Sequence, residues 1–384
     1  MRTYFDHNAT TPPAPEVVAA VVRALRDDFG NPSSVHHFGQ RAKALLDEAR
    51  SAVAELIGAE STDVVFTSGG TEGDNMALRG AAEAAEAAGS RRHVIASAIE
   101  HEAVLNTVKA LTRRGWTSTL LPVGARGVVA PGALAAAITP QTAIVSVMQA
   151  NNEIGTIQPI ADLAAIAHEH GAIFHTDAVQ SIAKIPVDVR TLGVDLLSLS
   201  GHKFNGPQGI GALWIRRGTR IVSTMTGGKH ERNRRGGTEN VPGIAGLGVA
   251  ARLARTKLKT EPARLAALRN RLEQGVIARV PGTAVNGDVT ARVPNTTNIS
   301  FDGVEAESLL IALDLDGFAV STGSACSSGT LEPSHVLRAM GLPSHRTQNS
   351  IRFSLGLGNT EAQVDALVER LPSVVAKLRT LVKR

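Results

Sequence analysis

The chain of 384 residues has only one cysteine, Cys326, so it can form no internal disulfide and no multi-cysteine zinc site. Aromatic residues make up only 3% of it, and its 40 lysines and arginines are spread out, with the densest cluster from Lys229 to Arg235. Nucleic-acid surfaces favour basic stripes with interleaved aromatic side chains. We therefore expect no direct binding of nucleic acid, and the net charge of +5 favours anionic small molecules or a protein partner.

No apolar run reaches the roughly 20 residues that a membrane helix needs, and the first residues, Met1 to Asp6, lack the apolar core of a signal peptide. We therefore expect a cytoplasmic protein without a membrane anchor. Hydrophobic residues (43%) and charged residues (20%) occur in the proportions of an ordinary globular protein. The length allows two domains, or one large domain with an appendage.

Short apolar segments alternate with helical patterns up to about residue 240. Because this alternation is typical of a mainly parallel sheet with helices on both faces, we predict an α/β fold whose site lies at the strand ends. From about residue 255 the pattern predicts a second, smaller α+β domain. The strands expected in the main sheet are 64–67, 93–97, 116–121, 143–148, 172–176, 195–200 and 210–215.

Three strand-to-helix junctions carry polar residues, each with two interpretations. Thr67 to Glu72 is a glycine turn that opens a helix; it either caps that helix or binds phosphate through backbone amides and a hydroxyl. His101 is either a capping residue or a side chain that stacks on a ring. Asp177 ends an apolar strand, where it either caps the next helix or pairs with a cation such as a protonated pyridine nitrogen.

Lys203 follows the strand 195–200 on a turn rich in glycine and proline. In isolation, a surface lysine is the simpler interpretation. A lysine shielded from water has a lowered pKa, however, and its free amine forms Schiff bases. Because Lys203 comes 203 − 177 = 26 residues after Asp177, the length of one crossover connection, we expect the two at neighbouring strand ends. The phosphate turn, Asp177 and Lys203, in this order, outline a pyridoxal phosphate site.

Ten motifs follow one another between residues 6 and 354. They are DHNATT (6–11), NPSSVH (31–36), TSGGTE (67–72), EH (100–101), NNEIG (151–155), HTDAVQ (175–180), SGHK (200–203), RGGTEN (235–240), GSACSS (323–328) and SIRFS (350–354). With these motifs in this order, the chain resembles the NifS/IscS-type cysteine desulfurases, which are class V aminotransferases among the fold type I pyridoxal phosphate enzymes. The resemblance implies a large domain at 15–255 with a mainly parallel seven-stranded sheet. It also implies a smaller α+β domain at 1–14 and 256–384 that carries the catalytic cysteine loop.

The resemblance also implies roles for individual residues. Lys203 would hold pyridoxal 5'-phosphate as a Schiff base and move the substrate's Cα proton, with His101 stacked on the ring as an assisting acid or base. Asp177 would pair with the ring nitrogen and Gln180 with the ring hydroxyl. Asn152 matches a residue near cofactor and substrate, and Arg352 one that binds the substrate carboxylate. The residues implied for the phosphate are Gly70, Thr71, Ser200, His202 and, from the neighbouring subunit of a homodimer, Thr238.

Cys326 matches the family's catalytic cysteine. The implied reaction removes sulfur from L-cysteine, releases L-alanine and leaves a persulfide on Cys326. That sulfur would pass to an acceptor protein such as an iron–sulfur scaffold, or toward tRNA or a thio-cofactor. No resident metal is implied, and Cys326 would be at most a transient iron–sulfur ligand.

Two other functions stay open. A selenocysteine lyase, or another class V lyase or aminotransferase, would keep Lys203 without needing Cys326. An inactive scaffold for iron–sulfur assembly would keep the fold, although the intact candidate residues argue against it. The sequence departs from the family at Asn205, Lys229 and Asn233, which we expect near the mouth of the cofactor site.

Overall fold

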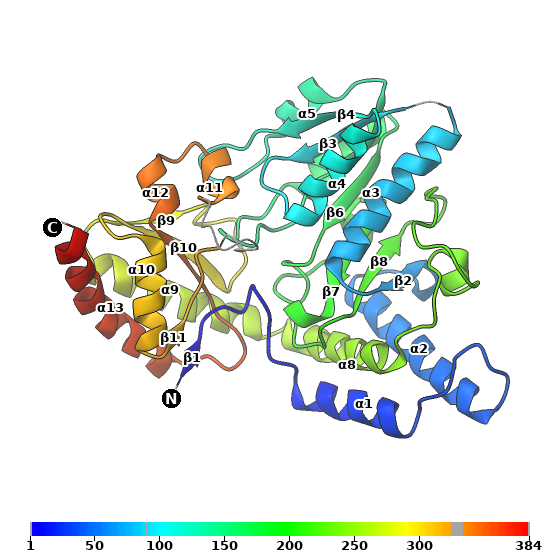
Figure 1. The fold of residues 1–384 in the computed structure, drawn as a ribbon, viewed down its shortest axis with the longest axis horizontal. Coiled ribbons are helices and arrows are strands. Elements are labelled where there is room, and N and C mark those ends of the chain that lie inside the picture. Colours follow the sequence, from blue (N-terminus) through cyan, green and yellow to red (C-terminus); the bar gives the residue numbers. More distant parts are fainter. Residues whose placement is uncertain (1, 90, 324–332, 383–384) are drawn as a thin grey trace.

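A seven-stranded sheet forms the centre of the protein in the computed structural model, which describes residues 2–89, 91–323 and 333–382. The strand order is β2-β8-β7-β6-β5-β3-β4 (Figure 1). All pairs from β7 to β4 are parallel, whereas β8 runs antiparallel to β2 and β7. The mainly parallel sheet predicted from the sequence is confirmed. The strands are β2 (Val64–Thr67), β3 (His93–Ser97), β4 (Thr117–Leu121), β5 (Thr142–Ser146), β6 (Ile173–Asp177), β7 (Leu196–Ser200) and β8 (Gly211–Ile215).

Successive residues of a strand pack on opposite faces of this sheet. In β3, Val94 and Ala96 join the core on one face, whereas Ile95 belongs to the core on the other. This alternation follows from the two-residue repeat of a strand, and two buried faces explain why the strands are apolar throughout. One face is covered by α3 (Gly70–Ala87) and α4 (Glu102–Arg113). The other is covered by α2 (His37–Leu56), α5 (Pro131–Ala137), α6 (Ile160–Glu169), α7 (Val189–Leu192) and α8 (Val241–Lys257), with α1 (Pro15–Arg26) lying on α8.

A second core lies beside the sheet and combines both ends of the chain (Figure 1). The antiparallel sheet β12-β10-β9 shares this core with α9, α10 and α13, and Phe5 is fully buried within it. β1 pairs with β11, which ties the N-terminal segment to this part of the protein. The division at residues 14/15 and 255/256 stays a prediction. The elements are β1 (Thr3–Tyr4), α9 (Glu261–Arg279), β9 (Thr283–Asn286), β10 (Thr296–Phe301), α10 (Ala306–Leu315), β11 (Phe318–Ala319), α11 (His335–Ala339), α12 (Ser344–Gln348), β12 (Ser350–Ser354) and α13 (Glu361–Val382).

The helical region that extends over residues 241–280 consists of two helices. α8 ends at Lys257 and α9 begins at Glu261, because Pro262 lacks an N–H and is tolerated only in the first turn of a helix. Within the three described stretches, none of the helices has the length and apolar character needed to cross a membrane.

Candidate active site

A cavity of about 560 Å³ lies where the carboxyl ends of β6 and β7 meet the second core. Its wall combines the end of β6, the end of β7 and the start of α3 with Arg352 of β12. This is the edge of the sheet at which α/β proteins bind ligands. The predicted site residues in this wall are Gly70, Thr71, His101, Asn152, Asp177, Gln180, Ser200, His202, Lys203 and Arg352.

The remaining candidate residues lie elsewhere. Thr238 is exposed between β8 and α8 and is not part of the wall, so its contact with a neighbouring subunit stays a prediction. Cys326 lies outside the described residues. Asn205, Lys229 and Asn233 are not among the residues that line the cavity, and their position near its mouth stays a prediction. Asn205 and Asn233 have φ angles of 64° and 65°, a left-handed conformation that asparagine tolerates, so local backbone geometry accounts for these two departures.

The start of α3 borders the cavity. A Cβ atom on Gly70 would lie 2.7 Å from Val179 Cγ2, so a larger residue does not fit there. First-turn amides of a helix have no intrahelical acceptor, and Gly70 and Thr71 both line the cavity. His202 completes this corner; burial, followed by the charge of Lys203, lowers its pKa to about 4, so its imidazole is neutral.

Asp177 is a buried carboxylate that has no cationic partner within hydrogen-bonding distance among the described residues. Its side chain is hydrogen-bonded by the Val179 amide, at 2.9 Å from Oδ1. Burial raises the pKa of Asp177, while the nearby His101 and Lys203 act to lower it. Because a buried carboxylate is costly without a cation, a positively charged ring nitrogen in the cavity would stabilise Asp177.

Lys203 follows β7 on the short turn Gly201–Lys203, and its strand is paired with that of Asp177 as predicted. Lys203 Nζ donates to the backbone carbonyls of Asn8 at 2.7 Å and Ala9 at 2.8 Å. Burial, followed by the charge of Arg352, lowers the pKa of Lys203 to about 8. The neutral amine, which Schiff-base formation requires, is therefore available at a lower pH than in an ordinary lysine.

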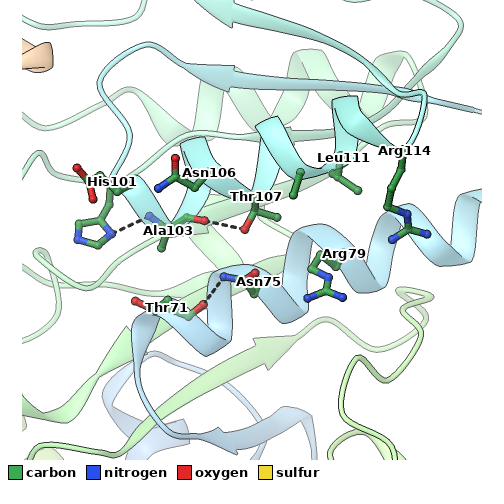
Figure 2. A pocket seen from close by; sticks show the side chains of 11 residues that line it. Thr71, Asn75, Arg79, His101, Ala103, Asn106, Thr107, Leu111 and Arg114 are labelled. Carbon is green, nitrogen blue, oxygen red and sulfur yellow. Dashed lines mark hydrogen bonds between the residues drawn. The ribbon is translucent and has the colours of Figure 1, made fainter. Parts of the chain in front are cut away.

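His101 combines the two roles that the sequence left open, because it caps α4 and also lines the cavity. Its Nδ1 accepts a hydrogen bond from the Ala103 amide at 3.1 Å, so the neutral imidazole carries its proton on Nε2. Thr71 and His101 also line a second cavity of about 530 Å³ between α3 and α4 (Figure 2). Thr71 and His101 therefore border both cavities.

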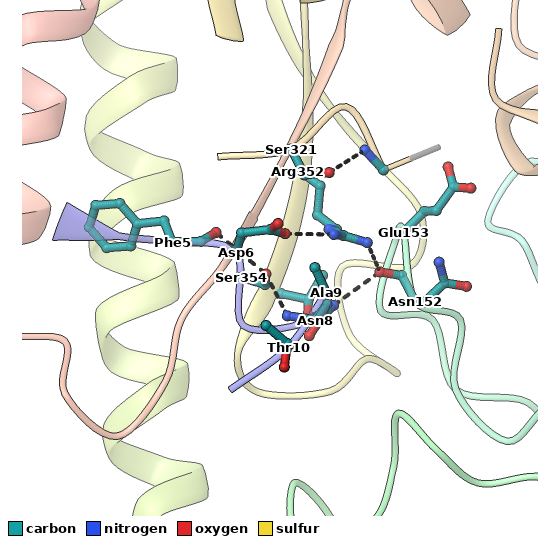
Figure 3. A network of polar contacts seen from close by, with 12 residues as sticks. Phe5, Asp6, Asn8, Ala9, Thr10, Asn152, Glu153, Ser321, Arg352 and Ser354 are labelled. Carbon is teal, nitrogen blue, oxygen red and sulfur yellow. Dashed lines mark hydrogen bonds and ion pairs between the residues drawn. The ribbon is translucent and has the colours of Figure 1, made fainter. Parts of the chain in front are cut away.

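Arg352 lies at the centre of a polar network (Figure 3). Its Nη2 pairs with Asp6 Oδ1 at 2.6 Å, and its Nη1 donates to the carbonyl of Asn152 at 3.0 Å. Its Nε is buried and has no hydrogen-bond partner in the described part of the chain. Since a guanidinium carries five N–H donors, Arg352 still has N–H groups that can donate to the carboxylate of a ligand.

Sequence reasoning missed several residues of this wall. Asn8 connects the site, since its backbone carbonyl accepts from Lys203 Nζ and Gln180 Nε2, and its side-chain Nδ2 donates to the carbonyl of Asn152. Asp74 is buried in the wall, and burial followed by the charge of Asp177 raises its pKa well above the usual range. Asp6 and Asn8 belong to the motif at 6–11, which marked this segment as part of the site. Their individual contacts could not be predicted, because their partners are distant in the sequence.

Comparisons with known proteins identify the family of this chain. Residues 3–367 match the sequence model of the family described as aminotransferase class-V. A cysteine desulfurase of Trichormus azollae is 50% identical over 378 residues, which are 98% of this chain and 94% of that protein. A cysteine desulfurase IscS of Dictyoglomus turgidum is 48% identical over 98% of this chain and 95% of its own length. A solved structure of a NifS-like protein covers 98% of this chain and 100% of its own, with a TM-score of 0.92 and 37% identity.

The chain therefore belongs to the aminotransferase class-V family. Within that family it is similar over nearly its full length to cysteine desulfurases. The resemblance predicted from its sequence motifs is thus confirmed.

Proposed function

We propose that this protein is a pyridoxal phosphate-dependent cysteine desulfurase that converts L-cysteine to L-alanine and leaves a persulfide on Cys326. One observation supports this most strongly. A single cavity combines Lys203, whose pKa is lowered, with Arg352 and with Asp177, which has no cationic partner within hydrogen-bonding distance among the described residues. The chain is 50% identical to a cysteine desulfurase.

The residues of the cavity fit pyridoxal phosphate. Its volume of about 560 Å³ is within the usual range for small-ligand sites. The start of α3, with Ser200 and His202, suits the phosphate, and Asp177 suits a protonated ring nitrogen. Gln180 suits the ring hydroxyl, and Lys203 suits the Schiff base. When bound, the cofactor supplies an electron sink that stabilises negative charge at the substrate's Cα.

The side chains of this protein supply binding and proton transfer. Arg352 binds the carboxylate of L-cysteine with its remaining N–H donors, and Asn152 lies beside it. Lys203 takes the Cα proton, since its lowered pKa makes the neutral amine available. His101 stacks over the ring position and assists proton transfer through Nε2.

Sulfur transfer follows at Cys326. Its thiolate attacks the sulfur of the substrate, so that an S–S bond forms while the C–S bond breaks. The electron pair of the broken bond stays with carbon, which takes up a proton to become the methyl group of alanine. The sulfur then passes from Cys326 to an acceptor such as an iron–sulfur scaffold protein.

We further propose that the protein is a cytoplasmic homodimer with a large domain at 15–255. Thr71 and His101 line the cavity and also the second cavity between α3 and α4 (Figure 2). Thr238 is exposed and outside the wall of its own chain. A second copy that brings its Thr238 to the phosphate corner would complete the site.

The test measures alanine and sulfide released from L-cysteine by the cofactor-loaded protein. Lys203→Ala should abolish turnover, while Lys259→Ala, at an exposed lysine, serves as the matched control. Cys326→Ser should keep the colour of the cofactor and lose sulfide release. Full turnover by Lys203→Ala would refute the proposal. Activity on L-selenocysteine alone would indicate a lyase, and a colourless protein after reconstitution would indicate a scaffold.

A further inference from the structure

Lys184 is a buried lysine directly behind the site, and no carboxylate pairs with it among the described residues. It is 7% exposed and follows Gln180 by four residues in the turn after β6. Its Nζ donates to Gln180 Oε1 at 2.5 Å and to Asn8 Oδ1 at 2.8 Å. Burial, followed by the charges of Lys203 and Arg352, lowers the pKa of Lys184 well below its usual range. The Lys184 amine thus donates to two side-chain oxygens.

The acceptors of Lys184 are side-chain amides, whose oxygen and nitrogen exchange places in a half-turn. Asn8 is held in one orientation, because its Nδ2 donates to the carbonyl of Asn152 at 3.0 Å and to Thr296 Oγ1 at 2.8 Å. Gln180 has fewer restraints. Its Nε2 donates to the carbonyl of Asn8 at 2.9 Å, and Lys184 donates to its Oε1. Without Lys184, one of these two restraints is lost and an oxygen atom is left buried without a donor.

The orientation of Gln180 matters because Gln180 lines the cavity. In the observed orientation, one Nε2 hydrogen binds the Asn8 carbonyl, and the other has no protein acceptor in the described stretches. That hydrogen can donate to an oxygen of a ligand. The opposite orientation would present Oε1, which repels the oxygen of an ionised ring hydroxyl.

We propose that Lys184 is a positioning residue: by donating to Gln180 Oε1 and Asn8 Oδ1, it holds Gln180 with Nε2 available to the ring hydroxyl oxygen of the cofactor. This inference rests on the proposed function, because it needs pyridoxal phosphate in the cavity. Lys184 would then affect cofactor binding without taking part in the reaction itself.

The experiment titrates apoprotein with pyridoxal phosphate and measures the Kd together with the visible absorption maximum of the loaded protein. Lys184→Met keeps the length of the side chain and removes the donor. Losing one hydrogen bond to an ionised oxygen should weaken binding about tenfold or more, and the absorption maximum should shift. Lys184→Gln, which restores a donor, should recover part of the affinity. Lys259→Met, at an exposed lysine, should change neither quantity.

Each outcome has one meaning. Wild-type affinity and an unshifted absorption maximum in Lys184→Met would overturn the inference. If that variant does not fold, Gln180→Leu replaces it, with the same loss expected and the same refutation. In a folded Gln180→Leu background, Lys184→Met should cause no further loss, whereas an additive loss would overturn the role through Gln180. Wild-type protein that binds no cofactor would instead refute the proposed function.

Discussion

A buried ion pair fixes the strand that leads into the phosphate corner. Glu231 binds Arg50 through two hydrogen bonds of 2.7 and 2.8 Å, and their side chains are 2% and 7% exposed. Glu231 also accepts from the Phe66 amide at 3.0 Å, and Arg50 donates to the carbonyl of Val64 at 2.8 Å. Both backbone groups belong to β2, which ends three residues before Gly70. The pair therefore joins the loop before α8 to this edge of the sheet.

We predict that Glu231→Gln destabilises the protein by about 2–4 kcal/mol. Leaving a buried guanidinium without its counterion costs about 3–5 kcal/mol. Part of this is offset, because Glu231 and the next two residues have φ angles of 44°, 56° and 65°. Relaxing such a left-handed turn recovers about 1 kcal/mol. The net loss of free energy of unfolding should be visible in urea titrations followed by the fluorescence of Trp214, which pairs with β2 from β8.

Two controls test the reasoning behind this magnitude. Glu83→Gln breaks a partly exposed pair with Arg114, and such pairs are worth about 0–1 kcal/mol. The double variant Arg50→Met with Glu231→Leu removes both charges and should recover most of the loss, because no unpaired ion stays buried. A loss below 1 kcal/mol in Glu231→Gln, or a double variant as unstable as the single one, would refute the argument.

Three further predictions concern the cavity. Asp6→Asn should lower the KM for L-cysteine about threefold to tenfold, because the Asp6 carboxylate competes for Arg352; a higher KM in alanine-release assays would contradict this. Asp177→Asn should keep the cofactor but reduce kcat by about 100-fold or more, as expected when a preorganised charge is lost from a dry site. Activity within threefold of wild type would rule that role out. Cofactor uptake by the apoprotein should accelerate with pH, reach half its maximum near pH 8, where half of the Lys203 amines are neutral, and level off above that pH; a rate that keeps rising toward pH 10.5 would show an ordinary lysine.

The strands of the main sheet could be predicted because each is a short apolar run that ends in turn residues. β2 and β3 begin and end where the sequence placed them, and the pairing of β6 with β7 follows from the spacing of Asp177 and Lys203. The short strand β1 has no such apolar run and could not be predicted from the sequence. β1 exists because Thr3 pairs with Phe318, a partner more than 300 residues away in the chain.

Some residues in and around the candidate site could likewise be predicted from the sequence, and others could not. Asp177 and Lys203 have a signal in the sequence, since Asp177 ends a strand, Lys203 follows the next one, and both belong to ordered motifs. Lys184 and Glu231 do not, because lysine and glutamate side chains are normally exposed. Their burial depends on Asn8 and Arg50, which tertiary packing brings to them from distant parts of the chain.

The most direct test of the proposed function is a single turnover followed by mass spectrometry. Cofactor-loaded protein receives one equivalent of L-cysteine, with no acceptor and no reductant present. The proposal predicts one alanine released per active site and one added sulfur atom, located on the peptide that contains Cys326. Alanine release without added sulfur on Cys326, or no alanine at all, would contradict it.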